Sequence, residues 1–155
     1  MKKKARKTEK TEKTDQRHRL ARKVGKFRAP CATLVGFEIS EIDEGRSVGY
    51  LDAGPQHANP MGTLHEGILC DLADSAMGMA FASTLKPRET FTTLELKINF
   101  PRPFWTGRLQ AKAHVLSRGR TVGLVECVVS DERQRLIAKA VSTCLILRGR
   151  QGTGR

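Results

Sequence analysis

The sequence lacks several features that mark particular classes of protein. No apolar run approaches the roughly 20 residues that a membrane-spanning helix needs, which excludes an integral membrane protein. No Cys-x-x-Cys pair occurs, and the four histidines show no metal-ligand spacing with the cysteines. We therefore expect buried free thiols in a reducing cytoplasm at Cys31, Cys70, Cys127 and Cys144.

The N-terminal segment, residues 1–28, lacks the apolar stretch of a secretory signal, contains no serine and has one aromatic residue, Phe27. It carries 13 Lys and Arg against three acids, a net charge of +10 out of +12 for the whole chain. The remaining residues are almost neutral. We interpret residues 1–28 as a basic flexible arm, either a solvated tail or a contact site for nucleic acid or another anionic surface.

The rest of the chain has the length and composition of one globular domain, which we place at residues 29–148, with a loose Gly- and Arg-rich tail at 149–155. Alternating patterns and turn residues predict strands at 34–42, 46–53, 92–99, 107–117, 120–130 and 135–147. A single helix is predicted at about 64–83. Strands grouped around one helix give an α+β fold with an antiparallel sheet. One helix cannot cover both faces of a six-stranded sheet. An exposed apolar face or edge would remain, so we expect an oligomer.

The predicted helix contains a carboxylate that is unusual in its setting. Thr63 and Glu66 have the spacing of a capping box at its start, and small and apolar residues surround Asp74 in its middle. Burying an unpaired carboxylate costs several kcal/mol, so Asp74 is either satisfied structurally or kept for a chemical task.

The loop before the helix presents polar groups beside a helix N-terminus. His57, Asn59 and His65 lie within nine positions, and the first helical amides can stabilise developing negative charge. His65 and Asp74 are nine residues apart, which is about 13 Å along a helix. They cannot share one small reacting group within a chain, so a joint site requires the helix of a second subunit.

Three blocks of sequence resemble the hotdog-fold acyl-CoA thioesterases of the PaaI type. They read HANPMGTLHEG at 57–67, LADSAMG at 72–78 and TTLELKINF at 92–100, the last followed by Arg102 and Pro103. The similarity runs from about residue 34 to residue 147. It implies a long central helix wrapped by a five- to six-stranded antiparallel sheet, dimers that pair into a homotetramer, and active sites between subunits.

The resemblance also implies roles for individual residues. Asp74 would be the general base on a water, or the nucleophile on the thioester carbonyl. Asn59 would lie near the carbonyl or the water, and His65 would line the site at the start of the helix. The backbone N–H of Glu66 would polarise the carbonyl, and Thr93 would orient the water or Asp74. The further substrate-binding candidates, several of them basic because coenzyme A carries phosphates, are His57, Gly67, Lys97, Arg102, Arg118, Gly119 and Arg120.

Glu66 departs from the family, which usually has glycine at this position. Its backbone N–H serves as well as that of glycine. Its side chain is either a first-turn acid favoured by the helix dipole or a group that narrows the acyl pocket and repels anionic acyl groups.

The expected function is hydrolysis of an acyl-CoA thioester to acid and free CoA in the cytoplasm, without a metal or redox cofactor. One alternative is a non-catalytic acyl-CoA or lipid sensor of the same fold, with the arm on an anionic partner. The other is a hotdog dehydratase, whose His and acid spacing we do not find. The residues are compatible with both aromatic and aliphatic acyl groups.

Overall fold

The computed structural model describes residues 29–149, so the predicted basic arm and residues 150–155 of the tail lie outside the described residues. These described residues contain two α-helices, α2 at Pro30–Val35 and α3 at Glu66–Ala82, and a short 3-10 turn, η1, at Pro55–His57. The strands are β1 Phe37–Asp43, β2 Arg46–Ala53, β3 Glu89–Asn99, β4 Gly107–Arg118, β5 Val122–Asp131 and β6 Leu136–Arg148.

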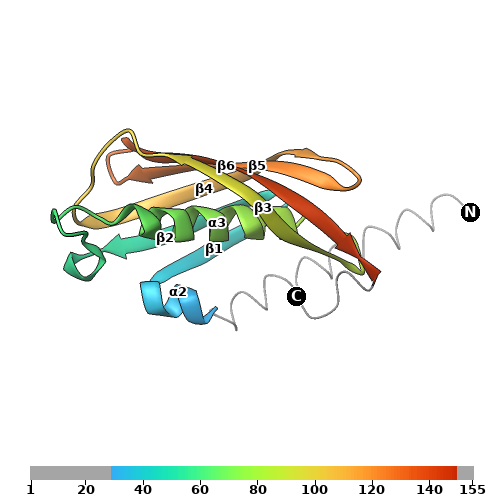
Figure 1. The fold of residues 1–155 in the computed structure, drawn as a ribbon, viewed down its shortest axis with the longest axis horizontal. Coiled ribbons are helices and arrows are strands. Elements are labelled where there is room, and N and C mark those ends of the chain that lie inside the picture. The colour runs from blue at the N-terminus through green and yellow to red at the C-terminus, as the bar shows by residue number, and fades with distance from the viewer. Residues whose placement is uncertain (1–28, 150–155) are drawn as a thin grey trace, which may run out of the picture.

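The six strands form one antiparallel sheet in the order β1-β2-β4-β5-β6-β3. The sheet curves around α3, which lies along its concave side, while α2 lies near the start of β1 (Figure 1). Strand β3 follows α3 in the chain, but among the described strands it pairs only with β6, so its other side is an open edge of this sheet. The predicted hotdog fold is confirmed: one long helix wrapped by an antiparallel sheet.

One face of α3 packs into the core and is almost inaccessible to solvent. Its buried residues, which pack against β2, β4 and β5, are Leu69, Leu72, Ala73, Ala76, Met77, Ala80 and Phe81. Two polar contacts fix the helix along its axis. The buried Ser47 hydroxyl donates to the Ala76 carbonyl (2.6 Å), and the Gly45 amide donates to the Ser83 hydroxyl (2.7 Å).

The start of α3 differs from the prediction. Thr63 is not its N-cap: the Thr63 hydroxyl accepts from Asn59, and the helix begins at Glu66 with His65 as cap. Leu64 is extended: it forms an isolated antiparallel β-bridge with Ala58, and its amide donates to the Phe104 carbonyl (2.8 Å). The capping-box prediction was wrong because a histidine ring, absent from the usual Ser/Thr rule, takes the capping role.

The first strand also differs. The sequence predicts strand from residue 34, but Pro30 to Val35 form α2, and β1 begins at Phe37. Proline at the first position of a helix is favourable, and Gly36 ends α2 in the left-handed conformation (φ 90°). These are strong helix signals over six residues, too short a stretch for periodicity to reveal.

All four cysteines are free thiols, but the prediction that they are buried holds only for Cys127 and Cys144. Cys31 is exposed on α2 and Cys70 is partly exposed on α3. Burial raises the pKa of Cys127 to about 12 and that of Cys144 to about 11, so both stay protonated at neutral pH. None of the helices within residues 29–149 is long and apolar enough to cross a bilayer.

Candidate active site

A carboxylate and a hydroxyl meet on the helix face turned toward β3. Asp74 lies in the middle of α3 and is partly buried. The Thr93 hydroxyl, on β3, donates a hydrogen bond to its Oδ1 atom (3.2 Å). The structure thus brings together two of the predicted site residues, and leaves Oδ2 of Asp74 without a hydrogen bond within the described residues.

The pKa of Asp74 lies above the usual aspartate value. Its largest cause is burial, which penalises the charged carboxylate, and the negative charge of Asp71 adds to it. The hydrogen bond from Thr93 acts in the opposite direction but does not cancel these effects. A carboxylate with a raised pKa takes a proton more readily than an ordinary surface acid, which suits proton transfer near neutral pH.

A β-bulge in β3 gives Thr93 its orientation. Strict alternation would put Thr93 on the face opposite Leu96 and Ile98. The β3–β6 register shifts between Thr93 and Glu95, however, and Leu96, Ile98 and Phe91 all pack against the core. The extra residue, Leu94, is 57 % exposed. Because of the bulge, Thr93 lies on the same face of β3 as Leu96 and Ile98, so this face contacts both the core and the Asp74 carboxylate. Bulges are common beside functional sites.

The helix N-terminus carries a second group of polar atoms. His65 is exposed, and its Nδ1 atom accepts a hydrogen bond from the Gly67 amide (2.9 Å). Glu66 is the first helical residue, and its amide makes no hydrogen bond within the described residues. An unpaired amide at the positive end of a helix dipole is a donor that a ligand oxygen can use. The Gly67 amide, by contrast, already donates to the His65 ring and is not available to a ligand oxygen.

Asn59 and His57 hold the loop before α3. Asn59 donates to the Thr63 hydroxyl (2.8 Å) and accepts from the Met61 amide (2.9 Å). His57 is buried; its Nδ1 atom accepts from the Gly54 amide, so its Nε2 atom carries the proton and donates to the Val35 carbonyl (2.8 Å). Both ring nitrogens of His57 are thus occupied, and it braces the loop against α2. Its contact with substrate stays a prediction.

The predicted basic residues are in different situations. Lys97, Arg102 and Arg120 are exposed. Arg118 instead pairs with Glu89 and donates to the Gly119 carbonyl (3.0 Å). Glu89, whose side chain is only 7 % exposed, also pairs with Arg148 (2.7 Å).

Glu89 and Arg148 were missed by the sequence reasoning, because no local pattern reveals a contact between residues so far apart in the chain. Glu89 and the Gly119 carbonyl hold the two terminal nitrogens of the Arg118 guanidinium, whereas the Arg120 side chain makes no hydrogen bond or ion pair within residues 29–149.

One chain does not bring the two halves of the site together. Glu66 and Asp74 are eight residues apart on α3, which separates them by about 12 Å along the helix axis. A hydrogen bond spans about 3 Å. Within residues 29–149, no group of three or more His, Cys, Asp or Glu residues could hold a metal ion.

A curved antiparallel sheet around one long central helix is the hotdog architecture of thioester hydrolases. The chain belongs to the thioesterase superfamily, whose family model matches residues 61–138, and within it to the PaaI type. It is accordingly a thioester hydrolase.

Known relatives agree with this membership. The acyl-coenzyme A thioesterase PaaI of Escherichia coli is 31 % identical, over 70 % of this chain and 76 % of that protein. The 1,4-dihydroxy-2-naphthoyl-CoA hydrolase of Listeria monocytogenes is 28 % identical, over 72 % of this chain and 89 % of the other. The solved structure of E. coli PaaI superposes with a TM-score of 0.73 at 27 % identity, covering 79 % and 87 % of the two chains.

Proposed function

We propose that this protein hydrolyses an acyl-CoA thioester to the free acid and CoA, with Asp74 as the catalytic carboxylate. The observation that carries the proposal is the pair formed by Asp74 and Thr93: a half-buried carboxylate, held at one oxygen and open at the other, with a raised pKa. The names of the relatives, which act on CoA thioesters, support the substrate class.

As general base, Asp74 takes a proton from a water whose oxygen attacks the thioester carbonyl carbon. The carbonyl oxygen gains the negative charge and accepts a hydrogen bond from the Glu66 amide. Collapse of this intermediate re-forms the carbonyl, breaks the carbon–sulfur bond and releases CoA as the thiolate, which takes up a proton.

As nucleophile, an Asp74 oxygen attacks the same carbon, CoA leaves, and water hydrolyses the resulting anhydride. Mass spectrometry of rapidly quenched enzyme distinguishes the two routes, because only the second attaches an acyl group to the peptide containing Asp74.

We further propose that each site takes Asp74 from one subunit and the Glu66 amide from its partner. The open edge of β3 supports this arrangement. Strand β3 is 11 residues long, no strand within residues 29–149 pairs with its outer side, and it carries the exposed Leu94. Such an edge is a template for pairing with another strand. Two copies that pair along β3 bury this edge in a dimer, or in a dimer of dimers.

The test replaces Asp74 with asparagine, which has the same shape but cannot act as a base. Asp71→Asn is the matched control, since Asp71 is exposed, lies one turn earlier on α3 and loses the same charge. With a panel of acyl-CoAs and a thiol reagent, Asp74→Asn should lower kcat by about 10²- to 10⁴-fold, and Asp71→Asn should retain activity. An Asp74→Asn protein that keeps the wild-type rate would rule Asp74 out.

The alternative of a non-catalytic sensor rests on the basic arm, which lies outside the described residues, and no observation in residues 29–149 favours it.

A further inference from the structure

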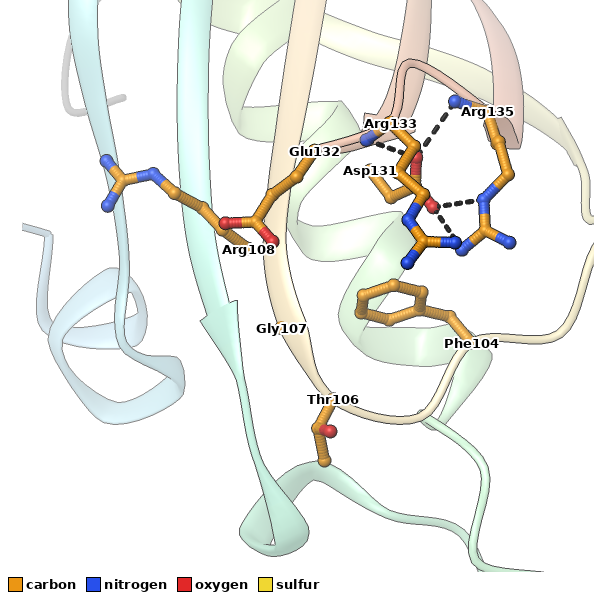
Figure 2. A pocket seen from close by; sticks show the side chains of 8 residues that line it. All are labelled: Phe104, Thr106, Gly107, Arg108, Asp131, Glu132, Arg133 and Arg135. Carbon is orange, nitrogen blue, oxygen red and sulfur yellow. Dashed lines mark hydrogen bonds and ion pairs between the residues drawn. The ribbon is translucent and has the colours of Figure 1, made fainter.

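A small pocket with three arginines lies beside the turn between β5 and β6. Its volume is about 220 Å³, and none of the proposed catalytic residues lines it. The lining residues are Phe104, Thr106, Gly107, Arg108, Asp131, Glu132, Arg133 and Arg135. In Figure 2 the side chains of Arg133 and Arg135 extend to the same side of the turn, above the ring of Phe104. Three basic side chains around a small cavity favour the binding of an anion.

The turn is built around a single buried carboxylate. Asp131 is 4 % exposed, and its Oδ1 atom accepts from the amides of Arg133 (3.0 Å) and Arg135 (2.9 Å). Its Oδ2 atom accepts from Nε of Arg135 (2.6 Å) and forms an ion pair with the NH2 nitrogen of Arg135 (2.6 Å). Both oxygens of Asp131 are thus occupied, and one edge of the Arg135 guanidinium is fixed in place.

These contacts leave cationic groups without a full complement of anions. Arg135 is 46 % exposed and its remaining N–H groups are available to a ligand. Arg133 is exposed, and its guanidinium has no hydrogen bond or ion pair within residues 29–149. Arg108, on the rim, is already paired with Asp52 at 3.6 Å and stacks over Tyr50. Glu132 is exposed and forms no ion pair within the described residues.

The floor of the pocket is formed by the Phe104 ring packed on Gly107. A Cβ atom at Gly107 would lie 3.5 Å from Cζ of Phe104, so the ring packs directly over the backbone of Gly107. The Phe104 carbonyl in turn accepts from Leu64, which fixes it to the segment before α3. The Arg135 guanidinium is likewise held by Asp131, so it binds an anion at a lower cost in conformational entropy than an unrestrained surface side chain does.

We propose that this pocket binds a single phosphoryl group, held by the guanidinium of Arg133 and the free edge of Arg135. Guanidinium groups match the oxygens of phosphate through paired, charge-assisted hydrogen bonds. The volume argues for one phosphoryl group, since pockets for whole cofactor-sized ligands begin at roughly 300 Å³. The group comes either from free phosphate or from a phosphate of CoA.

The test measures phosphate binding to the full chain by calorimetry and by fluorescence. Trp105 is the one tryptophan of the sequence, is 57 % exposed and adjoins Phe104 and Thr106 of the pocket, so it reports on this site. The variant is Arg133→Gln, which leaves the contacts of Asp131 with Arg135 intact. The control is Lys112→Gln, which removes one positive charge from an exposed position on β4 outside the pocket. Any binding to the basic arm is the same in both variants.

Inorganic phosphate should bind the wild type and Lys112→Gln equally, and Arg133→Gln at least about tenfold more weakly, since a charge-assisted contact is lost. Absence of saturable binding to the wild type by both methods, or equal binding by Arg133→Gln, would overturn the proposal. Titrations with CoA and dephospho-CoA identify the source. If a phosphate of CoA occupies the pocket, which rests on the proposed function, Arg133→Gln weakens CoA binding. Dephospho-CoA binding is then unchanged if the group is the 3′-phosphate and weakened if it is the diphosphate. If free phosphate occupies the pocket, Arg133→Gln weakens the binding of neither CoA nor dephospho-CoA.

Discussion

The amide of Glu66 can be removed from the proposed site without disturbing the helix that carries it. Proline at position 66 lacks the N–H. Glu66 is the first residue of α3, where the N–H has no partner in the helix and where proline is favoured. The preceding residue, His65, has φ −64° and ψ 129°, an extended conformation that a following proline requires. The stability change should therefore stay below about 1 kcal/mol, mostly from loss of a first-turn acid.

The kinetic effect should be much larger than the effect on stability. If the Glu66 amide donates to the oxygen that becomes negative, its loss should lower kcat by about 10²- to 10³-fold, the usual cost of removing one donor of this kind. The change corresponds to about 3–4 kcal/mol of activation free energy. It should fall on kcat rather than on KM, because the hydrogen bond strengthens only as the charge develops.

The assay is release of free CoA from an acyl-CoA, followed with a thiol reagent, together with thermal unfolding of each variant. Glu66→Gln is the control, since it removes the carboxylate but keeps the N–H. Glu66→Gln should retain a rate near that of the wild type, or gain activity on anionic acyl groups if the Glu66 side chain repels them. If Glu66→Pro is folded and turns over at the rate of Glu66→Gln, the amide is not the donor.

Two further predictions concern pH and packing. Because burial raises the pKa of Asp74, kcat/KM should fall, as the pH is lowered, around a pKa above the usual aspartate range, and a profile that breaks at an ordinary aspartate pKa would contradict this. The same shift means that the folded state holds the proton more tightly than the unfolded state, so Asp74 disfavours folding once the pH rises above its raised pKa. Asp74→Asn should therefore raise the free energy of unfolding at neutral pH, and this gain should shrink in acid. Gly123→Ala would place a Cβ atom 2.2 Å from Cε2 of Phe81, and should lower the free energy of unfolding by about 1–3 kcal/mol, as measured by the urea midpoint; an unchanged midpoint would show that the core yields at this point.

The sequence was sufficient for the order and type of most elements. The strand predicted at 46–53 coincides with β2, and the helix containing Asp74 ends within one residue of its predicted end. These succeed because burial imposes a regular period on long elements. The short helix α2 escaped notice because six residues show too little of any period.

The site was predicted less completely, for a physical reason. The contact of Thr93 with Asp74 depends on a bulge in β3. Strict alternation would have turned the Thr93 side chain away from the face of β3 that packs against the core. The pairing of Arg118 with Glu89 depends on residues 29 positions apart. Both are products of tertiary packing, which local patterns do not encode.

The most direct test of the account is subunit complementation between Asp74→Asn and Glu66→Pro. Each variant alone should be nearly inactive. A heterodimer purified through two different affinity tags contains one site with both defects and one with neither, if each site combines Asp74 of one subunit with the Glu66 amide of the other. It should regain about half of the wild-type activity per dimer, as symmetry requires for two shared sites. A heterodimer as inactive as its parents would show that both groups act within one chain.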